Sequence, residues 1–490
     1  MKFNKYFIVP IMIISFAFVP AASALEERQI EDGASLSLKD CIEISLSNSP
    51  LVKRTIYNLR TAKNNISLAK SAFTPTIGVG AGINQNLSST TGTPHRSSNT
   101  KSLPTVNAYI SEMLWNFGKT NATIRMQKFN KIAAEYEFNY SVLTTIFDVK
   151  LKYYGVLAAK SLLDIEKANV QMNERNYIRT QAYFDEGIRS KIDLVNAEAY
   201  LSDAKIALVQ AENNYKQALV ALNNSMYVPY APEYEISNTE TFNLKNPYVP
   251  ISLTQIGNYR DLDDVPAEVQ DATLTASVDK TEVLEDYEFT KYPYTFEESV
   301  DLAMKNRPDL KALNASVDAM KQYLLAVKRQ YYPNLSANLG YGLNNSEHFA
   351  TNSMSLSLDL SSSVNIFQHV KEVDNAKIQV EYAQNEVKLL SENLYFDVQE
   401  AYIAMIQLEK QIPLLETKVR QTLENLELAD GRYEVGLSDY IELQDARVNY
   451  NNAQNSYVQT IYKYNVARAT LEQFIALEQD TTLKAKDLGL

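Results

Sequence analysis

The sequence predicts a mainly α-helical protein with a small membrane β-barrel, built from one long module that occurs twice. Short motifs recur in the same order in both halves of the chain. NSPLV, which contains Pro50, recurs as NRPDL, which contains Pro308, and YFDEG at Gly187 recurs as RYEVG at Gly436. Each copy is expected to run helix, strand, strand, very long helix, helix. Self-similarity over so long a period predicts a pseudo-symmetric structure.

The motifs divide the chain into five parts. We expect a signal peptide at residues 1–24, a first copy at 25–227, a second copy at 294–478 and a C-terminal tail at 479–490. The segment 228–293 between the copies is rich in Pro, Asp and Glu and shows little helical periodicity. It is expected to be an acidic linker that packs around the middle of the helices.

The N-terminus has the features of a secretory signal. Lys2 and Lys5 form a basic start, residues 7–19 are mostly apolar, and Ala22 and Ala24 flank Ser23 in a small-residue cleavage site. The alternative is an uncleaved membrane anchor, for which the apolar run is short. No later segment approaches the roughly 20 apolar residues of a spanning helix. We therefore expect an exported chain without a helical membrane span.

Composition argues against several classes of function. The net charge is −12 and no basic patch offsets it, so nucleic acid is not an expected partner. Cys41 is the only cysteine, which excludes an intrachain disulfide, and it is expected in a short helix. His95, His348 and His369 lack metal-ligand spacing, and no phosphate-binding glycine loop or nucleophile motif occurs. We therefore expect no catalytic residue, metal or cofactor, and no enzyme.

Four segments alternate between apolar and small or polar residues, which predicts strands at about 75–87, 103–117, 333–344 and 352–367. In a soluble sandwich the apolar faces would meet each other. In an outer-membrane barrel they would meet lipid, and the polar faces would line a lumen. Four strands cannot close a barrel, whereas three chains would supply twelve, which suits a membrane barrel with a polar bore.

Each copy contains a helical run of exceptional length, from residue 119 to about 184 and from 369 to about 433, or nearly 100 Å each. The second run has apolar residues at heptad spacing over 373–394 and again over 398–419, which predicts a coiled-coil seam. Pro413 is expected to kink it. The helix before the strands and the helix after the turn, stacked end to end, together match the long helix in length. Three chains would then form a closed helical cylinder.

These motifs resemble those of the TolC family of outer-membrane factors, over nearly all of the mature chain. The resemblance rests on the N-x-P entry of both copies, the proline before each first strand, the LWNFG and VNIF exits, and the run GRYEVGLSDYIELQDAR. It implies a homotrimer in the outer membrane: a 12-stranded β-barrel in the lipid, joined to a long periplasmic α-helical barrel.

The resemblance also implies partners and a role. The channel would work with a periplasmic adaptor (a membrane fusion protein) and an inner-membrane transporter of the ABC or RND type. It would carry drugs in efflux, or proteins in type I secretion. The alternative is a structural periplasmic coiled coil or adaptor, but an adaptor would have one helical hairpin flanked by soluble β domains. A self-contained porin would need more strands per chain.

An acidic pair follows the second helical turn. In the family, such a pair rings the constricted pore, and the matching residues here are Glu442 and Asp445. Their spacing places both carboxylates on one helix face. Three copies would converge six carboxylates near the axis, which would attract cations and repel anions. The alternative is an ordinary solvated acidic face.

The resemblance further implies a polar network that holds the two turns together in the closed state. Tyr433 matches the tyrosine of that network and Asp193 its aspartate. The position of the family's arginine holds Ser438, which leaves the network without its cation.

The basic residues of the turns lie instead in the first copy. Our hypothesis is a charge-reversed lock in which Arg189 or Lys191 pairs with Asp439 or Glu442. The alternative is a set of independent surface charges, which contribute little to stability.

The turns DEGIRS and EVGLSD are expected to be the docking tips for the adaptor. Gly187 and Gly436 lie within them. A glycine at this position suits a turn that requires a positive φ.

Overall fold

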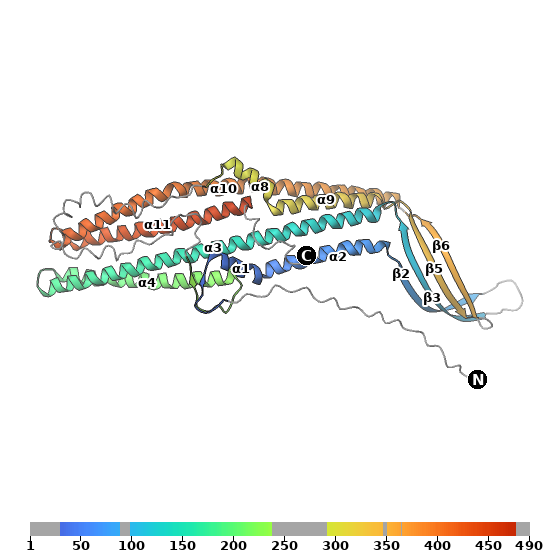
Figure 1. The fold of residues 1–490 in the computed structure, drawn as a ribbon, viewed down its shortest axis with the longest axis horizontal. Helices are drawn as coiled ribbons and strands as arrows, with labels where there is room; N and C mark the ends of the chain where they lie inside the picture. The colour runs from blue at the N-terminus through green and yellow to red at the C-terminus, as the bar shows by residue number, and fades with distance from the viewer. Residues whose placement is uncertain (1–29, 89–98, 238–291, 346–349, 364, 477–490) are drawn as a thin grey trace, which may run out of the picture.

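The computed structural model describes residues 30–88, 99–237, 292–345, 350–363 and 365–476. The predicted signal peptide, nearly all of the predicted linker and the tail lie outside the described residues. The described part is mainly helical and elongated, with a four-stranded sheet at one end (Figure 1).

The first copy begins with two helices rather than the single one expected. Its elements are α1 (Leu38–Asn48), α2 (Pro50–Lys70), the 3-10 helix η1 (Ser71–Phe73), strands β2 (Thr76–Ser88) and β3 (Asn99–Trp115), and helices α3 (Lys119–Asp185) and α4 (Lys191–Ser225). The second copy repeats this order. It consists of α8 (Phe296–Asn306), α9 (Pro308–Lys328), β5 (Asn334–Asn345), β6 (Ala350–Ser361), α10 (Ile366–Glu434) and α11 (Tyr440–Ile475).

The recurring N-x-P motif marks the break between the two opening helices. Asn48 ends α1, Ser49 caps α2 through its side chain, and Pro50 is the first residue of α2. Asn306 and Pro308 occupy the same positions at the junction of α8 and α9. Proline fits the first helical position because no backbone donor is needed there, and it disfavours helical backbone in the residue before it.

The strand predicted over 352–367 ends earlier, and that part of the prediction is wrong. β6 stops at Ser361 and α10 begins at Ile366, so Phe367 is helical. The side chain of Asn365 accepts a hydrogen bond from the backbone nitrogen of Gln368 at 3.2 Å. This N-cap starts the helix, although the apolar alternation of the sequence continues through Ile366.

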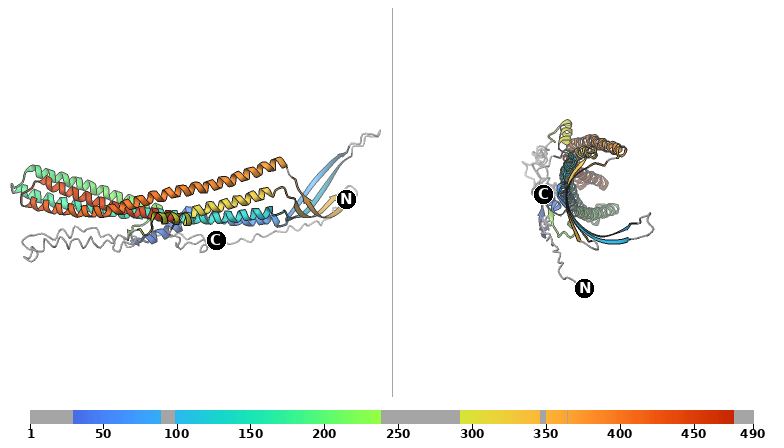
Figure 2. Two further views of the ribbon diagram at one scale, coloured as in Figure 1. Left: turned by 90° about the horizontal axis from the view of Figure 1, so that it is seen from above. Right: turned by 90° about the vertical axis from the view of Figure 1, so that its right-hand side faces the viewer.

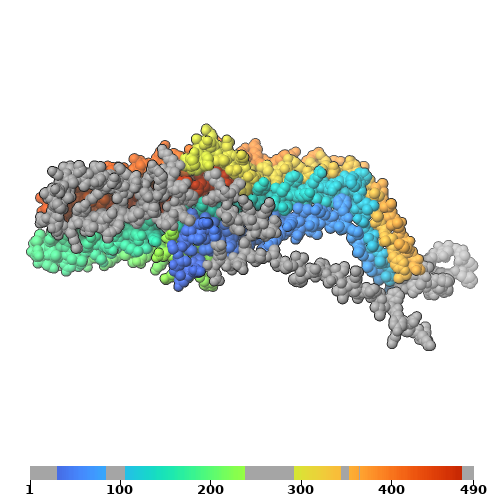
Figure 3. Space-filling model, viewed as in Figure 1, coloured from blue at the N-terminus to red at the C-terminus, as the bar shows by residue number. Residues whose placement is uncertain are grey.

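The two long helices, α3 and α10, run from the sheet to the far end of the molecule. Helices α2 and α4 follow one another along α3, and α9 and α11 follow one another along α10 (Figures 1 and 2). Across the copies, α3 also packs against α9 and α11. The space-filling view shows the resulting rod, with the strands bent away from one end (Figure 3).

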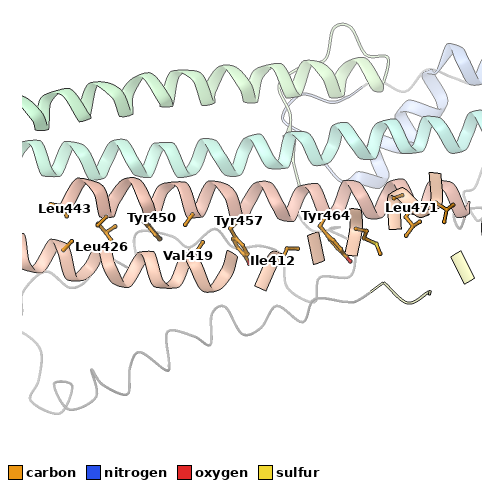
Figure 4. Close-up of a cluster of buried hydrophobic side chains, with 14 of the residues drawn as sticks. Ile412, Val419, Leu426, Leu443, Tyr450, Tyr457, Tyr464 and Leu471 are labelled. Atoms are coloured by element: carbon orange, nitrogen blue, oxygen red, sulfur yellow. The ribbon is translucent and has the colours of Figure 1, made fainter. Parts of the chain in front are cut away.

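A heptad seam joins α10 to α11. On α10 the buried residues repeat every seven positions, and those of α11 do the same (Figure 4). The α10 set is Val398, Met405, Ile412, Val419, Leu426 and Tyr433, and the α11 set is Leu443, Tyr450, Tyr457, Tyr464 and Leu471. This confirms the coiled-coil seam predicted over 398–419.

The other half of α10 is different. Between 373 and 394, the buried heptad residues are Ala376 and Leu394, and the rest are only half-buried in a single chain. Pro413 does not end the helix, because α10 is continuous through it. The proline lies on the exposed side of the helix.

A second core lies at the middle of the rod. The strands β1 (Ser35–Leu36) and β4 (Glu235–Ile236) pair in parallel and tie together the segments that precede α1 and follow α4. Beneath them, one cluster of buried side chains joins α1, α3 and α4. It includes Cys41, Tyr153, Tyr154, Leu222 and Met226. Cys41 is fully buried in α1, as expected for a residue of a short helix.

The four long strands form one antiparallel sheet in the order β2-β3-β5-β6. The register places all the apolar residues of the alternating segments on one face. One row across the sheet is Ile77, Ile110, Leu339 and Leu356. This apolar face is open, with Ile77 73% and Leu356 78% exposed.

The opposite, polar face carries the glycines. Gly78 pairs with Tyr109, which pairs with Gly340. A Cβ built on Gly78 would lie 2.3 Å from the Tyr109 ring, and one on Gly340 would lie 2.8 Å from Oγ of Ser355. Side chains crowd on the inner side of a bend, so glycine is required there. Figure 2 shows that the sheet is curved. The crowding at the glycines leads us to interpret the polar face as the concave one.

Candidate functional site

Two helical turns with the same backbone lie side by side at the end of the rod far from the sheet (Figure 1). Gly187 has a φ of +74° and Gly436 a φ of +75°. The next residue in each turn donates back into the last turn of the long helix: Ile188 to Tyr183 O, and Leu437 to Arg432 O, both at 2.8 Å. These are Schellman-type ends, in which glycine avoids the steric cost of a positive φ.

Each following helix has its own cap. In the first turn, Ser190 Oγ accepts from the backbone nitrogen of Asp193, and Asp193 Oδ2 accepts from that of Ser190. In the second, Asp439 Oδ1 accepts from the backbone nitrogen of Glu442 at 2.9 Å. Asp193 and Asp439 are thus cap residues. Asp193 forms its hydrogen bonds within its own capping box and does not bond to Tyr433 among the described residues.

Tyr433 lies at the centre of the contact between the turns and is fully buried. The Arg189 guanidinium stacks 4.4 Å from the ring centre, and its Nη2 donates to the Tyr433 carbonyl at 3.0 Å. The Arg179 guanidinium lies 5.2 Å from the same ring centre. A buried aromatic face attracts cations, and the carbonyls that end α10 carry the negative pole of the helix dipole.

The predicted ion pair of Arg189 with Asp439 or Glu442 is not formed within the chain. Arg189 is directed at Tyr433 instead, while Lys191 is exposed at the first position of α4. Among the described residues, the partner of Glu442 is Arg432, at 2.9 Å. Arg189 thus adds a side-chain donor to a carbonyl of the last α10 turn, which also accepts from the backbone nitrogen of Gly436.

A network that the sequence did not suggest lies about one helical turn further in. Arg179 of α3 reaches Asp430 at 2.8 Å and Glu434 at 3.0 Å, both on α10. Arg447 of α11 lies 3.6 Å from the same Asp430. This places three helices and both copies in one charged cluster. No local motif reveals it, since Arg179 and Asp430 meet only once the registers of α3 and α10 are fixed.

The two arginines of this cluster are not equivalent. Burial lowers the pKa of Arg179, but the hydrogen bond and charge of Asp430 outweigh this, so the pKa is raised. Burial lowers the pKa of Arg447 to about 10, with only partial compensation by Asp430. Nε and Nη1 of Arg447 also lack a hydrogen-bond partner. Arg179 therefore holds the carboxylates, and Arg447 is poorly satisfied in this packing.

The acidic pair lies on the opposite side of α11 from its buried seam. Glu442 is half-buried and Asp445 is exposed, whereas Leu443 and Ala446 between and beside them are buried. Arg432 places a positive charge beside Glu442, whereas no ion pair of Asp445 is formed among the described residues.

No described helix is long and apolar enough to cross a membrane. In the same residues, no group of His, Cys, Asp and Glu side chains is arranged to hold a metal ion.

The sheet, the paired long helices and the twin turns together define a class, the channels that sit in the outer membrane and extend into the periplasm. The model of the family "Outer membrane efflux protein" matches residues 41–226 and 299–477. The chain belongs to this family of TolC-like outer-membrane factors, which confirms the resemblance seen in the sequence.

Individual relatives are distant. The outer membrane efflux protein BepC of Brucella suis is 27% identical over 223 residues, which are 41% of this chain and 46% of BepC. The matched region is thus less than half of that relative. The solved CmeC outer membrane channel of Campylobacter jejuni has a TM-score of 0.70 and 15% identity, over 92% of this chain and 88% of CmeC. The open-state MtrE outer membrane channel of Neisseria gonorrhoeae gives 0.68 and 17%, over 94% and 97%.

Proposed function

We propose that the protein is the exit channel of a tripartite export system and is assembled from three copies of this chain. The observation that carries the proposal is the sheet. Its outer strands, β2 and β6, have 13 and 12 residues and no second partner among the described residues. Long uncovered edges pair with further strands, and a curved sheet with one apolar and one polar face closes into a barrel.

The edge helices support the same assembly. Helices α4 and α10 lie at opposite edges of the helical layer (Figure 1). Each exposes apolar residues at helical spacing that the described part of the chain leaves uncovered. On α4 these are Ile192, Val195, Ile206, Val209 and Val220, and on α10 they are Ile378, Tyr382, Leu389, Phe396, Ile403 and Leu414. Apolar stripes of this kind indicate a protein partner. In the proposed trimer, α4 of one chain meets α10 of the neighbouring chain.

Cross-linking tests the assembly. Val209 lies as many residues from Gly187 as Leu414 does from Gly436, so the two side chains meet at one level of the rod. The variant with Val209→Cys and Leu414→Cys should give disulfide-linked dimers and trimers on oxidation in outer-membrane fractions. The native Cys41 is fully buried and does not compete. The control pairs Val209→Cys with Val419→Cys, a buried seam residue, and should not cross-link.

A soluble periplasmic monomer without cross-links would overturn the channel and favour the adaptor alternative. A trimer should also conduct ions in planar lipid bilayers. Removing the acidic pair by Glu442→Gln with Asp445→Asn should reduce its preference for cations, because a ring of carboxylates disfavours anions.

In the closed state, the turns are held together by arginines of the first copy acting on α10. Arg189 and Arg179 flank Tyr433, and Arg179 also binds Asp430 and Glu434. Opening the rod end requires α3 and α10 to separate, which breaks these contacts. The gate thus uses a cation–ring clamp in place of the predicted pairing with Asp439 or Glu442.

The turns themselves are the proposed docking tips for a periplasmic adaptor. Ile188 and Leu437, which follow Gly187 and Gly436, are 62% and 73% exposed. An inner-membrane transporter of the ABC or RND type would deliver the cargo. Deleting the gene and testing drug sensitivity and protein secretion in parallel separates drug efflux from type I secretion.

A further inference from the structure

Asp359 is a charged residue on the polar face of the sheet. It lies on β6 close to the strand's helix-proximal end, and it pairs with Ser336 of β5. Among the polar-face side chains that the structure describes, no other is charged. The carboxylate is exposed. On the proposed function above, this face lines the bore of the barrel.

The carboxylate is held in place by neutral groups. Asn338 Nδ2 donates to Asp359 Oδ2 at 2.5 Å, and Ser357 Oγ donates to the same oxygen at 2.8 Å. Asn338 is itself fixed, because its Oδ1 accepts from Ser111 Oγ at 2.6 Å. These bonds orient the charge across β3, β5 and β6 without cancelling it. The amide and hydroxyl donors are neutral, and among the described residues no cation forms an ion pair with Asp359.

We infer that Asp359 sets the ion preference of the barrel: three copies form a ring of fixed negative charge in the bore, separate from the acidic pair at the turns. The inference rests on the proposed trimeric channel. Rings of carboxylates favour cations in a polar pore. Solutes that pass this level are therefore preferably cationic or neutral, and anions are retarded.

The sheet also provides a matched control. Glu112 of β3 lies at the same end of the sheet and pairs with Ala337. By the alternation of the strand, its side chain projects from the apolar face. Glu112→Gln removes the same charge from the other side of the sheet, where it should have no effect on permeating ions.

The test is the potassium-to-chloride permeability ratio of reconstituted trimers, taken from reversal potentials in a salt gradient. Asp359→Asn should lower the ratio about two- to fourfold near 0.1 M salt, where charges act over about 10 Å. The effect should vanish near 1 M salt, where they act over about 3 Å. Asp359→Glu should restore the ratio, and Glu112→Gln should leave it at the wild-type value.

Ser357→Lys gives a second route that keeps Asp359 and places an ammonium group beside it, so it should shift the ratio in the same direction. Channels of wild-type conductance and unchanged ratio in both Asp359→Asn and Ser357→Lys would overturn the inference and leave the channel intact. Failure of the wild-type protein to conduct would overturn the proposed function, and this inference with it.

Discussion

The two helical turns have the same backbone and opposite side-chain chemistry. Both end a long helix with a left-handed glycine and open the next helix with a side-chain cap. They differ where the side chains leave their own copy. Arg189 of the first turn occupies the position of Ser438 in the second, and it reaches across to α10. The two turns therefore share the glycine and the cap that each needs to fold, and they differ in the side chains that make contacts between the turns.

The charges also differ in kind. The first copy supplies the guanidinium groups of Arg179 and Arg189, and the second supplies the ring and carboxylates that receive them as well as Arg447. The following experiments test this division of roles, from the largest expected effect to the smallest.

Breaking the Arg179 cluster should have the largest effect. Arg179→Leu leaves Glu434 without this partner and Asp430 with only the 3.6 Å contact to Arg447. The closed packing should lose about 2–3 kcal/mol, because a half-buried charged hydrogen-bond network is disrupted. The open probability of the reconstituted channel should rise at least tenfold. Lys205→Leu removes an exposed pair with Glu174 on the same hairpin and should change little. If Arg179→Leu and Lys205→Leu gave the same open probability, Arg179 would have no special role in closing the channel.

Removing Arg189 should have the next largest effect. Arg189→Ala deletes the stacking on Tyr433 and the bond to its carbonyl, which together contribute about 1–2 kcal/mol. Single-channel recordings should show more frequent openings. Arg189→Lys should recover only part of the closure, because an ammonium lacks the planar face and fork of a guanidinium. Full recovery by lysine would mean that charge alone matters.

Alanine at the turn glycines tests whether the two backbones are equivalent. Gly187→Ala and Gly436→Ala meet no neighbouring atom, so the cost is the strain of a positive φ, about 1 kcal/mol in each case. Hydrogen exchange at both turns should quicken to a similar degree. Gly431→Ala, inside α10 and also without a steric contact, should instead slow exchange slightly. Unequal effects of the two turn variants would show that one turn is held by contacts outside itself.

Substitutions of Asp439 should have the smallest effect. They distinguish its role as the N-cap of α11 from the predicted role as an ion-pair partner of Arg189. Asp439→Ala removes the acceptor for the Glu442 nitrogen and should cost about 1 kcal/mol in denaturant titrations. Asp439→Ser keeps a capping oxygen and removes the charge, so it should behave like the wild type in stability and conductance. An increase in conductance with Asp439→Ser would revive the charge-reversed pair with Arg189.

The sequence predicts the long elements well and the contacts between them poorly. Heptad spacing locates the seam from Val398 to Val419, and the recurring Pro50 and Pro308 mark real helix starts, because both signals act within a few residues. The predicted end of β6 is wrong, because apolar and polar residues alternate through Ile366 as they do in a strand. Asn365 is an N-cap that starts α10 at that point, and the alternation gives no sign of it. The partner of Arg179 could not be found at all. Residues 179 and 430 lie on helices that both pack against α11, so they meet only in the assembled bundle, which no local pattern records.

The contacts of α3 with α9 and α11 have a consequence for how the molecule is held together. Helix α3 of the first half packs against α9 and α11 of the second half, so the first half does not bury its long helix by itself. The covalent connection between the halves raises their effective concentration. The packed interface of α3 with α9 and α11 holds them together. Two fragments, one for each copy, should accordingly recognise each other as a heterodimer.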